Sequence, residues 1–90
     1  MATNFHTVNS NTFQQVDLAS MGISDGDVFS IQNPSERPIV FFSGSSLPTE
    51  TKGRIIYPHE DRGYVKVAGE NLYVKKFQSI DPNTIINFEV

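Results

Sequence analysis

The densest group of side chains that could do chemistry is the run His59-Glu60-Asp61. An imidazole beside two carboxylates can bind a divalent metal ion or act as an acid–base pair. Neighbours on an extended chain point to opposite faces, however, so His59 and Glu60 do not converge on one atom. Pro58 precedes the run and Gly63 follows it, which is typical of an exposed hairpin loop. The sequence therefore predicts a turn here rather than a metal site.

Serine is the second residue type that could carry a reaction. Ser43, Ser45 and Ser46 lie close together, but no Gly-x-Ser-x-Gly elbow surrounds them. The segment also lacks the lysine and the following helix of a phosphate-binding loop. The only other histidine, His6, lies in a polar N-terminal segment, and there is no cysteine, so a metal site is short of ligands. We therefore expect no catalytic residue, no cofactor and no metal, and a protein that is not an enzyme.

Charge and hydropathy exclude two further classes of partner. Ten acidic residues against seven basic ones give a net charge of -3, whereas phosphate neutralisation by a nucleic-acid-binding protein requires the opposite sign. The adjacent pair Lys75-Lys76 suits a solvated strand face. The longest apolar runs, such as Ile39–Phe42, are far too short for a membrane span, and no signal peptide pattern follows Met1. We expect no nucleic acid and no membrane among the partners.

Alternation of apolar and polar residues predicts the elements that must position these side chains. In Gly63–Phe77, for example, Val65 and Val67 alternate with Lys66, and a Gly-Glu-Asn turn follows. The expected strands begin near Phe13 and continue with Val28–Gln32, Ile39–Phe42, Arg54–Tyr57, Tyr64–Val67, Leu72–Phe77 and Thr84–Val90. The predicted fold is all-β, a single small antiparallel β-sandwich or barrel of seven to eight short strands. Residues 1–11, which are mostly polar, are expected to form a flexible N-terminal arm before a domain of residues 12–90.

Two features predict contact surfaces. Ile39–Phe42 is apolar on both faces, and a lone 90-residue sandwich can cover only one face well, so we expect an oligomer, with a trimer favoured. Tyr57, Tyr64 and Tyr73 could instead form a sugar-binding platform if two of the rings lie side by side. The predicted interface residues are Phe5, Val8, Val40, Phe42, Leu47, Tyr64 and Tyr73. The polar loop Ser43–Gly53 is also expected to touch partners.

The stretch Val28–Phe77, a little over half of the chain, contains Ile31-Gln32-Asn33 before a turn, then Pro58-His59-Glu60, and then Gly69-Glu70-Asn71-Leu72-Tyr73-Val74. In this order it resembles small β-sandwich virion proteins of tailed bacteriophages, in which "I-Q-N", "P-x-E" and "G-x-x-L-Y-V" occur at the same places. Met1–Asn11 matches no part of that pattern.

The resemblance implies a non-enzymatic structural protein of the virion, made in the host cytoplasm. The favoured role is a capsid decoration, or cement, protein on the head surface, bound to the major capsid protein or other virion proteins. A tail or head–tail connector component is the alternative within that class, and a carbohydrate-binding module is the alternative from another class.

Overall fold

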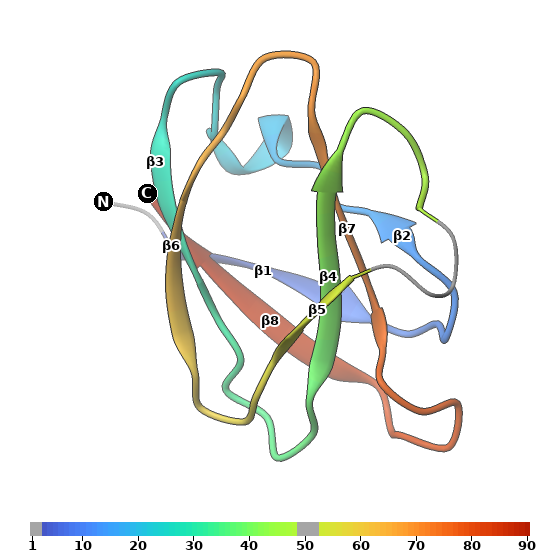
Figure 1. Cartoon of the computed structure of the whole chain (residues 1–90). Helices are drawn as coiled ribbons and strands as arrows, with labels where there is room; N and C mark the ends of the chain where they lie inside the picture. Colours follow the sequence, from blue (N-terminus) through green and yellow to red (C-terminus); the bar gives the residue numbers. More distant parts are fainter. Residues whose placement is uncertain (1–2, 49–52) are drawn as a thin grey trace.

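The computed structural model describes residues 3–48 and 53–90 and shows an all-β fold of eight strands in two antiparallel sheets (Figure 1). The elements are β1 (Thr3–Val8), β2 (Gln14–Gln15), the short 3-10 helix η1 (Ala19–Met21), β3 (Val28–Gln32), β4 (Ile39–Gly44), β5 (Arg54–Ile56), β6 (Asp61–Val65), β7 (Asn71–Lys76) and β8 (Thr84–Glu89). The predicted fold class is confirmed, and most of the predicted strands agree with these bounds within one to three residues.

The order of the strands is β1-β8-β3-β6 in one sheet, called sheet A below, and β2-β7-β4-β5 in the other, called sheet B. The first strand pairs with the last, β2 with β7, β3 with β6 and β4 with β5, as in one long antiparallel hairpin. Further pairing of β8 with β3 and of β7 with β4 rolls this hairpin into two layers. This arrangement is that of a jelly roll, an eight-stranded form of the β-sandwich.

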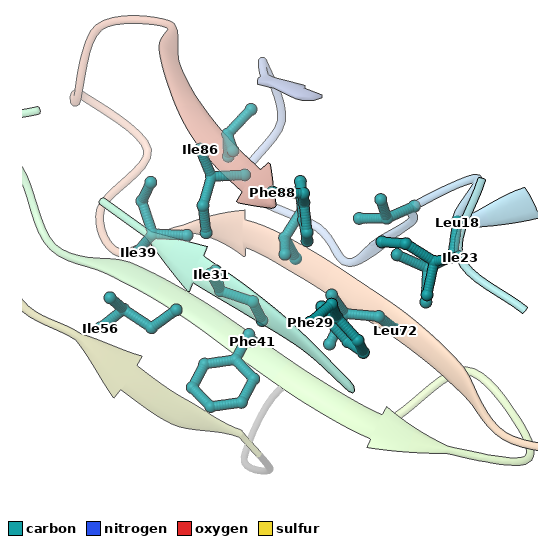
Figure 2. Packing of buried hydrophobic residues seen from close by; sticks show 13 residues of the cluster. Leu18, Ile23, Phe29, Ile31, Ile39, Phe41, Ile56, Leu72, Ile86 and Phe88 are labelled. Carbon is teal, nitrogen blue, oxygen red and sulfur yellow. The ribbon is translucent and has the colours of Figure 1, made fainter. Parts of the chain in front are cut away.

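One hydrophobic core lies between the two sheets (Figure 2). Its members follow the period of two that each strand imposes: Phe29 and Ile31 point inward from β3, and Ile86 and Phe88 from β8. The buried cluster comprises Val8, Val16, Leu18, Ile23, Phe29, Ile31, Ile39, Phe41, Ile56, Leu72, Val74, Ile86 and Phe88. Two inward rings from neighbouring strands of sheet A, Phe29 on β3 and Phe88 on β8, meet there at 6.3 Å between centroids.

Strand β1 lies in the segment expected to be a flexible arm, which corrects that prediction for residues 3–8. All six residues of β1 pair with β8, and the Val8 side chain is fully buried. The Asn4 side-chain amide also donates a hydrogen bond to the carbonyl of Met21 at 3.2 Å. The segment is too polar to order by itself, but β8 supplies a complete row of backbone partners. Met1 and Ala2 lie outside the described residues.

The second apolar face of Ile39–Phe42 is covered by the chain itself, which corrects the expectation of an exposed contact strand. Val40 on this outer face of sheet B is only 9% exposed, because Phe13 and Tyr73 pack beside it. The backbone at Gly53, where φ is 131°, passes close to the Val40 side chain. A Cβ atom added at Gly53 would lie 2.6 Å from a Val40 methyl group. Residues 49–52 of the predicted Ser43–Gly53 loop lie outside the described residues.

Asn33 joins the two sheets at the end of β3. Its buried side-chain amide donates hydrogen bonds to the carbonyls of Arg37 at 2.7 Å and Ile56 at 3.0 Å. Its carbonyl oxygen accepts hydrogen bonds from the amide and the hydroxyl of Ser35 at 3.0 and 2.6 Å. All the hydrogen-bonding capacity of this side chain is therefore used to hold a turn of sheet A against β5 of sheet B.

Candidate docking surface

The run His59-Glu60-Asp61 forms part of the tight connection between β5 and β6, and its three side chains do not gather. His59 has a positive φ of 65° and lies 2.9 Å from the exposed carboxylate of Glu36. Glu60 instead pairs with the guanidinium of Arg62 at 2.9 Å. Asp61 begins β6 and points outward from sheet A. A turn is present as predicted, but it is not a hairpin, because β5 pairs with β4 in sheet B whereas β6 pairs with β3 in sheet A. Its three charged side chains point to different places.

Arg62 closes the gap between β6 of sheet A and β5 of sheet B. Its guanidinium donates a hydrogen bond to the carbonyl of Ile55 at 2.8 Å and lies 5.7 Å from the centre of the Phe41 ring. The backbone amide of Tyr57 and then Arg62 hold the pKa of the Glu60 carboxyl below its ordinary value. A structural ion pair at a sheet edge accounts for these charges.

The described parts of the chain gather no group of three or more His, Asp or Glu side chains that could hold a metal ion. Ser43 lies in β4 and contacts the carboxylate of Glu70 at 3.4 Å, while Ser45 and Ser46 are exposed in the bend that follows. No histidine accompanies these serines in any hydrogen bond that the described residues make. In residues 3–48 and 53–90, no helix has the length and apolar character needed to cross a membrane.

The predicted interface residues occupy three different environments. Phe5 and Leu47 are exposed. Phe42 and Tyr64 are partly buried, Phe42 on the outer face of sheet B and Tyr64 at the edge of the core. Val8, Val40 and Tyr73 are buried within the chain's own fold. The surface accessible to a partner therefore retains Phe5, Leu47 and the exposed parts of Phe42 and Tyr64.

The three tyrosines do not form a platform. Tyr64 points inward from β6, with its ring 5.3 Å from that of Phe41 in an edge-to-face arrangement. Tyr73 points outward from β7 in the other sheet and is 5% exposed. Only Tyr57, in the turn after β5, is an exposed ring. Tyr64 and Tyr73 are not neighbours on paired strands, because β6 and β7 belong to different sheets.

A different surface stands out on the structure, namely the outer face of sheet A. Its outward residues form four rows across the strands: Thr7 and Ile85; Phe5, Asn87, Gln32 and Asp61; Glu89, Ser30 and Gly63; and Val28 and Val65. Successive rows are two residues apart in sequence, which corresponds to about 7 Å along a strand. The first and the last of the four rows are therefore separated by about 20 Å. The described part of the chain places no element over these rows (Figure 1).

Both ends of this face are apolar. At one end the cross-strand pair Val28 and Val65 is 67% and 56% exposed. Toward the other end, Phe5 is 63% exposed and Ile85 41% exposed. Apolar side chains usually face inward on strands of this kind, so their presence on the wet face at both ends indicates a contact surface.

The middle of the face is polar and hollow. A depression of about 200 Å³ is lined by Ser30, Gln32, Asp61, Asn87 and Glu89. Two amides meet at its base, where the Asn87 side chain donates a long hydrogen bond of 3.5 Å to Gln32. Gly63 keeps the adjoining surface open, since an added Cβ atom there would meet nothing within 4 Å. None of the outward residues in the four rows is Lys or Arg, so the hollow is acidic.

Two other hollows lie outside this face. One, of about 420 Å³, lies beside η1, and its single cation, Lys66, is already paired with Asp25 at 2.9 Å. The other, of about 380 Å³, is lined largely by Phe41, Phe42 and Tyr64 at the gap between the sheets.

Comparison with models of known protein families, with curated proteins and with solved structures finds no match to this chain. The candidate surface therefore rests on the geometry of sheet A alone. Sequence analysis identified Phe5 as a contact residue. It did not identify the exposed pair Val28 and Val65, whose apolar character alone does not say which face they occupy.

Proposed function

We propose that the chain is a non-enzymatic structural protein of a bacteriophage virion, a decoration protein that binds the outside of the assembled head. The observation that carries the proposal is the outer face of sheet A, over which the described residues place no element and which has exposed apolar residues at both ends. The resemblance of Val28–Phe77 to small β-sandwich virion proteins supplies the class. The partner would be the major capsid protein or another virion protein that meets this face.

The distribution of charge supports a binding role rather than a reaction. The carboxylates of Glu60 and Asp25 are engaged in ion pairs, and the described imidazoles belong to different elements, His6 to β1 and His59 to the β5–β6 turn. Jelly rolls are used in viral capsid proteins and in lectins alike, so the fold is compatible with the proposal but does not select it.

Self-association, most simply as a trimer, is part of the proposal. A small domain gains stability by burying surface against copies of itself. Because β4 is covered at Val40, the contact would use the corner of sheet B where Phe42 is partly exposed and Leu47 is 63% exposed. Light scattering of the isolated protein measures this directly, and Leu47→Asp should lower the mass if the corner is the contact.

The decisive experiment compares virions that carry the protein with virions from which its gene has been deleted. A cement protein ties neighbouring capsid subunits together, so heads without it should release DNA at a lower temperature. Release can be followed with a DNA-binding dye during heating, and adding back the purified protein should restore the original temperature. Deleted heads that are as heat-stable as complete ones would contradict the proposal.

Copy number separates the head from the tail. Hundreds of copies per particle by gel densitometry favour the head surface, whereas about six or twelve favour a tail or connector ring assembled through an exposed strand edge. A glycan array tests the carbohydrate-binding alternative, for which the tyrosines do not provide the expected side-by-side platform.

A further inference from the structure

We infer that strand β1 pairs edge to edge with β1 of a second copy of this chain, across a two-fold axis that passes through Phe5. The pairing joins two four-stranded copies of sheet A into one continuous sheet. It is a property of the chain by itself and goes beyond the proposed function, on which it does not depend.

Strand β1 presents a free edge. It is the first strand of sheet A and pairs only with β8. An edge strand directs the backbone groups of alternate residues away from the sheet. Within residues 3–48 and 53–90, no hydrogen bond gives the backbone of Asn4–Val8 a partner outside β8. A row of N–H donors and C=O acceptors along β1 is therefore open to another strand.

The sequence of β1 carries none of the devices that keep a sheet edge from pairing. Native edges are blocked by charged side chains, by proline, by a bulge or by being very short. Thr3–Val8 contains no Lys, Arg, Asp, Glu or Pro, runs for six residues, and keeps an unbroken register against β8. The other edges differ, since β2 has two residues, β5 has three and includes Arg54, and β6 begins with Asp61 and Arg62. Among these four edges, β1 is the one suited to strand addition.

The register of the pairing follows from the face that each side chain occupies. Residues opposite each other in an antiparallel pair lie on the same face of the sheet. Phe5 and Thr7 point outward, whereas Asn4 and His6 point inward. A two-fold axis through Phe5 keeps the faces together, because it sets Phe5 opposite Phe5 and Asn4 opposite His6 of the second copy. A shift by one residue would set an outward side chain against an inward one.

The apolar side chains at this edge indicate a second copy as the occupant. The Phe5 ring is exposed on the outer face, and so is Ile85 on the adjoining strand. The two-fold axis brings the two Phe5 rings into direct cross-strand contact, with Ile85 diagonally beside each of them. A copy also meets no opposing Asp, Glu, Lys or Arg along Thr3–Val8. The strand is thus self-complementary, as a two-fold contact requires.

The pairing is compatible with the other contacts proposed for the molecule. Its axis is perpendicular to the sheet, so the outer faces of both copies point to the same side and can meet one partner surface together. The corner at Phe42 and Leu47, which the proposed trimer uses, belongs to the other side of the sandwich.

A disulfide tests both the contact and its register, since the chain has no cysteine of its own. The Cα atoms of residue 5 in the two copies would be about 4.5–5.5 Å apart, within the span of a disulfide. Those of residue 7 would be about 14 Å apart, because they are offset by four residues. Under mild oxidation, Phe5→Cys should form a covalent dimer at least about tenfold faster than the matched control Thr7→Cys. A denaturing gel reads this dimer without interference from a trimer contact.

Sedimentation equilibrium measures the affinity without a cysteine. Phe5→Asp removes the ring pair and sets two carboxylates opposite each other, so the dissociation constant of the dimer should rise by at least about tenfold. The control Val28→Asp makes the same kind of change at an exposed position of β3, away from the β1 edge. It should leave the dissociation constant within about twofold of the wild-type value. Circular dichroism checks that both variants are folded.

Three results would overturn the inference: equal rates of cross-linking at positions 5 and 7, a mass that Phe5→Asp leaves unchanged, or an equal effect of Val28→Asp. Wild-type protein that stays monomeric at about 1 mM would also overturn it and would leave the β1 edge to a strand of a different protein. None of these measurements uses phage heads. Loss of the virion role would therefore leave the pairing standing, and loss of the pairing would leave the virion role standing.

Discussion

The substitution Asn33→Ala should destabilise the fold more than any ordinary surface change, because it removes a buried side chain that makes four hydrogen bonds. Two of these go to the carbonyls of Arg37 and Ile56, and two come from Ser35. Each such bond contributes about 1 kcal/mol net, and the local pair with Ser35 is partly replaceable by water because that turn is near the surface. The expected loss is about 3 kcal/mol, against a total of roughly 5–13 kcal/mol for a domain of this size.

Urea unfolding followed by circular dichroism measures this effect. With a slope of about 1 kcal/mol per molar urea, the midpoint should fall by about 3 M while the slope stays unchanged. Asn33→Asp should be worse still at neutral pH, since a carboxylate would then face two carbonyl oxygens. The matched control is Asn87→Ala, which removes one long hydrogen bond on the outer face and should change stability by less than about 0.5 kcal/mol. If Asn33→Ala and Asn87→Ala unfold at the same urea concentration, the two sheets are not held together at Asn33 in the way described.

Three further predictions concern the covered face of sheet B and strand β1. Gly53→Ala should cost about 1–3 kcal/mol by denaturant unfolding, because its φ is 131° and the new Cβ would contact Val40; Gly26→Ala, at φ of 87° with open space around it, should cost less. Phe13→Ala should cost about 3 kcal/mol and should increase binding of a hydrophobic dye, since it uncovers Val40. Burial lowers the pKa of His6, whose Nε2 lacks a hydrogen-bond partner, so the unfolded state binds more protons and stability should fall as the pH drops from about 7.5 to about 5.5. His6→Phe should flatten that dependence, and an unchanged dependence would show that another group causes it.

The strands that alternation identified are those whose inward residues are large and apolar. In β3 and β8 the inward residues are Phe29, Ile31, Ile86 and Phe88, and their spacing alone gives both the element and its buried face. Strand β1 does not show this pattern. Asn4 and His6 point inward at the margin of the sandwich, whereas Phe5 points outward. In this part of β1 the polar side chains are therefore more buried than the apolar one. The sequence could not reveal this strand because its order comes from pairing with β8.

The docking surface was predictable only in part. The face on which a side chain lies, and the sheet that its strand joins, both depend on the topology of the whole chain. Alternation places Val65 and Tyr64 on opposite faces of their strand, but it does not indicate that Tyr64 is the residue that points inward. Likewise, nothing local places Gln32 beside Asn87, which lies 55 positions later and reaches it only when the hairpin rolls up. Val40 was expected to be exposed, since the cover that Phe13 and Gly53 provide is equally a consequence of topology.

The central position of β8 in sheet A also determines when the protein can fold. Before β8 is present, β1 has no partner strand and sheet A consists of β3 and β6 alone. On a ribosome, Thr3–Val8 must therefore wait unpaired until Thr84–Glu89 has emerged, so the fold closes only after nearly the whole domain has been synthesised. Closure between such distant segments is slow, in the range of milliseconds to seconds for sandwiches of this type. During that interval the exposed edge of β3 is the place where a neighbouring nascent chain could insert its own β8, producing a strand-exchanged dimer.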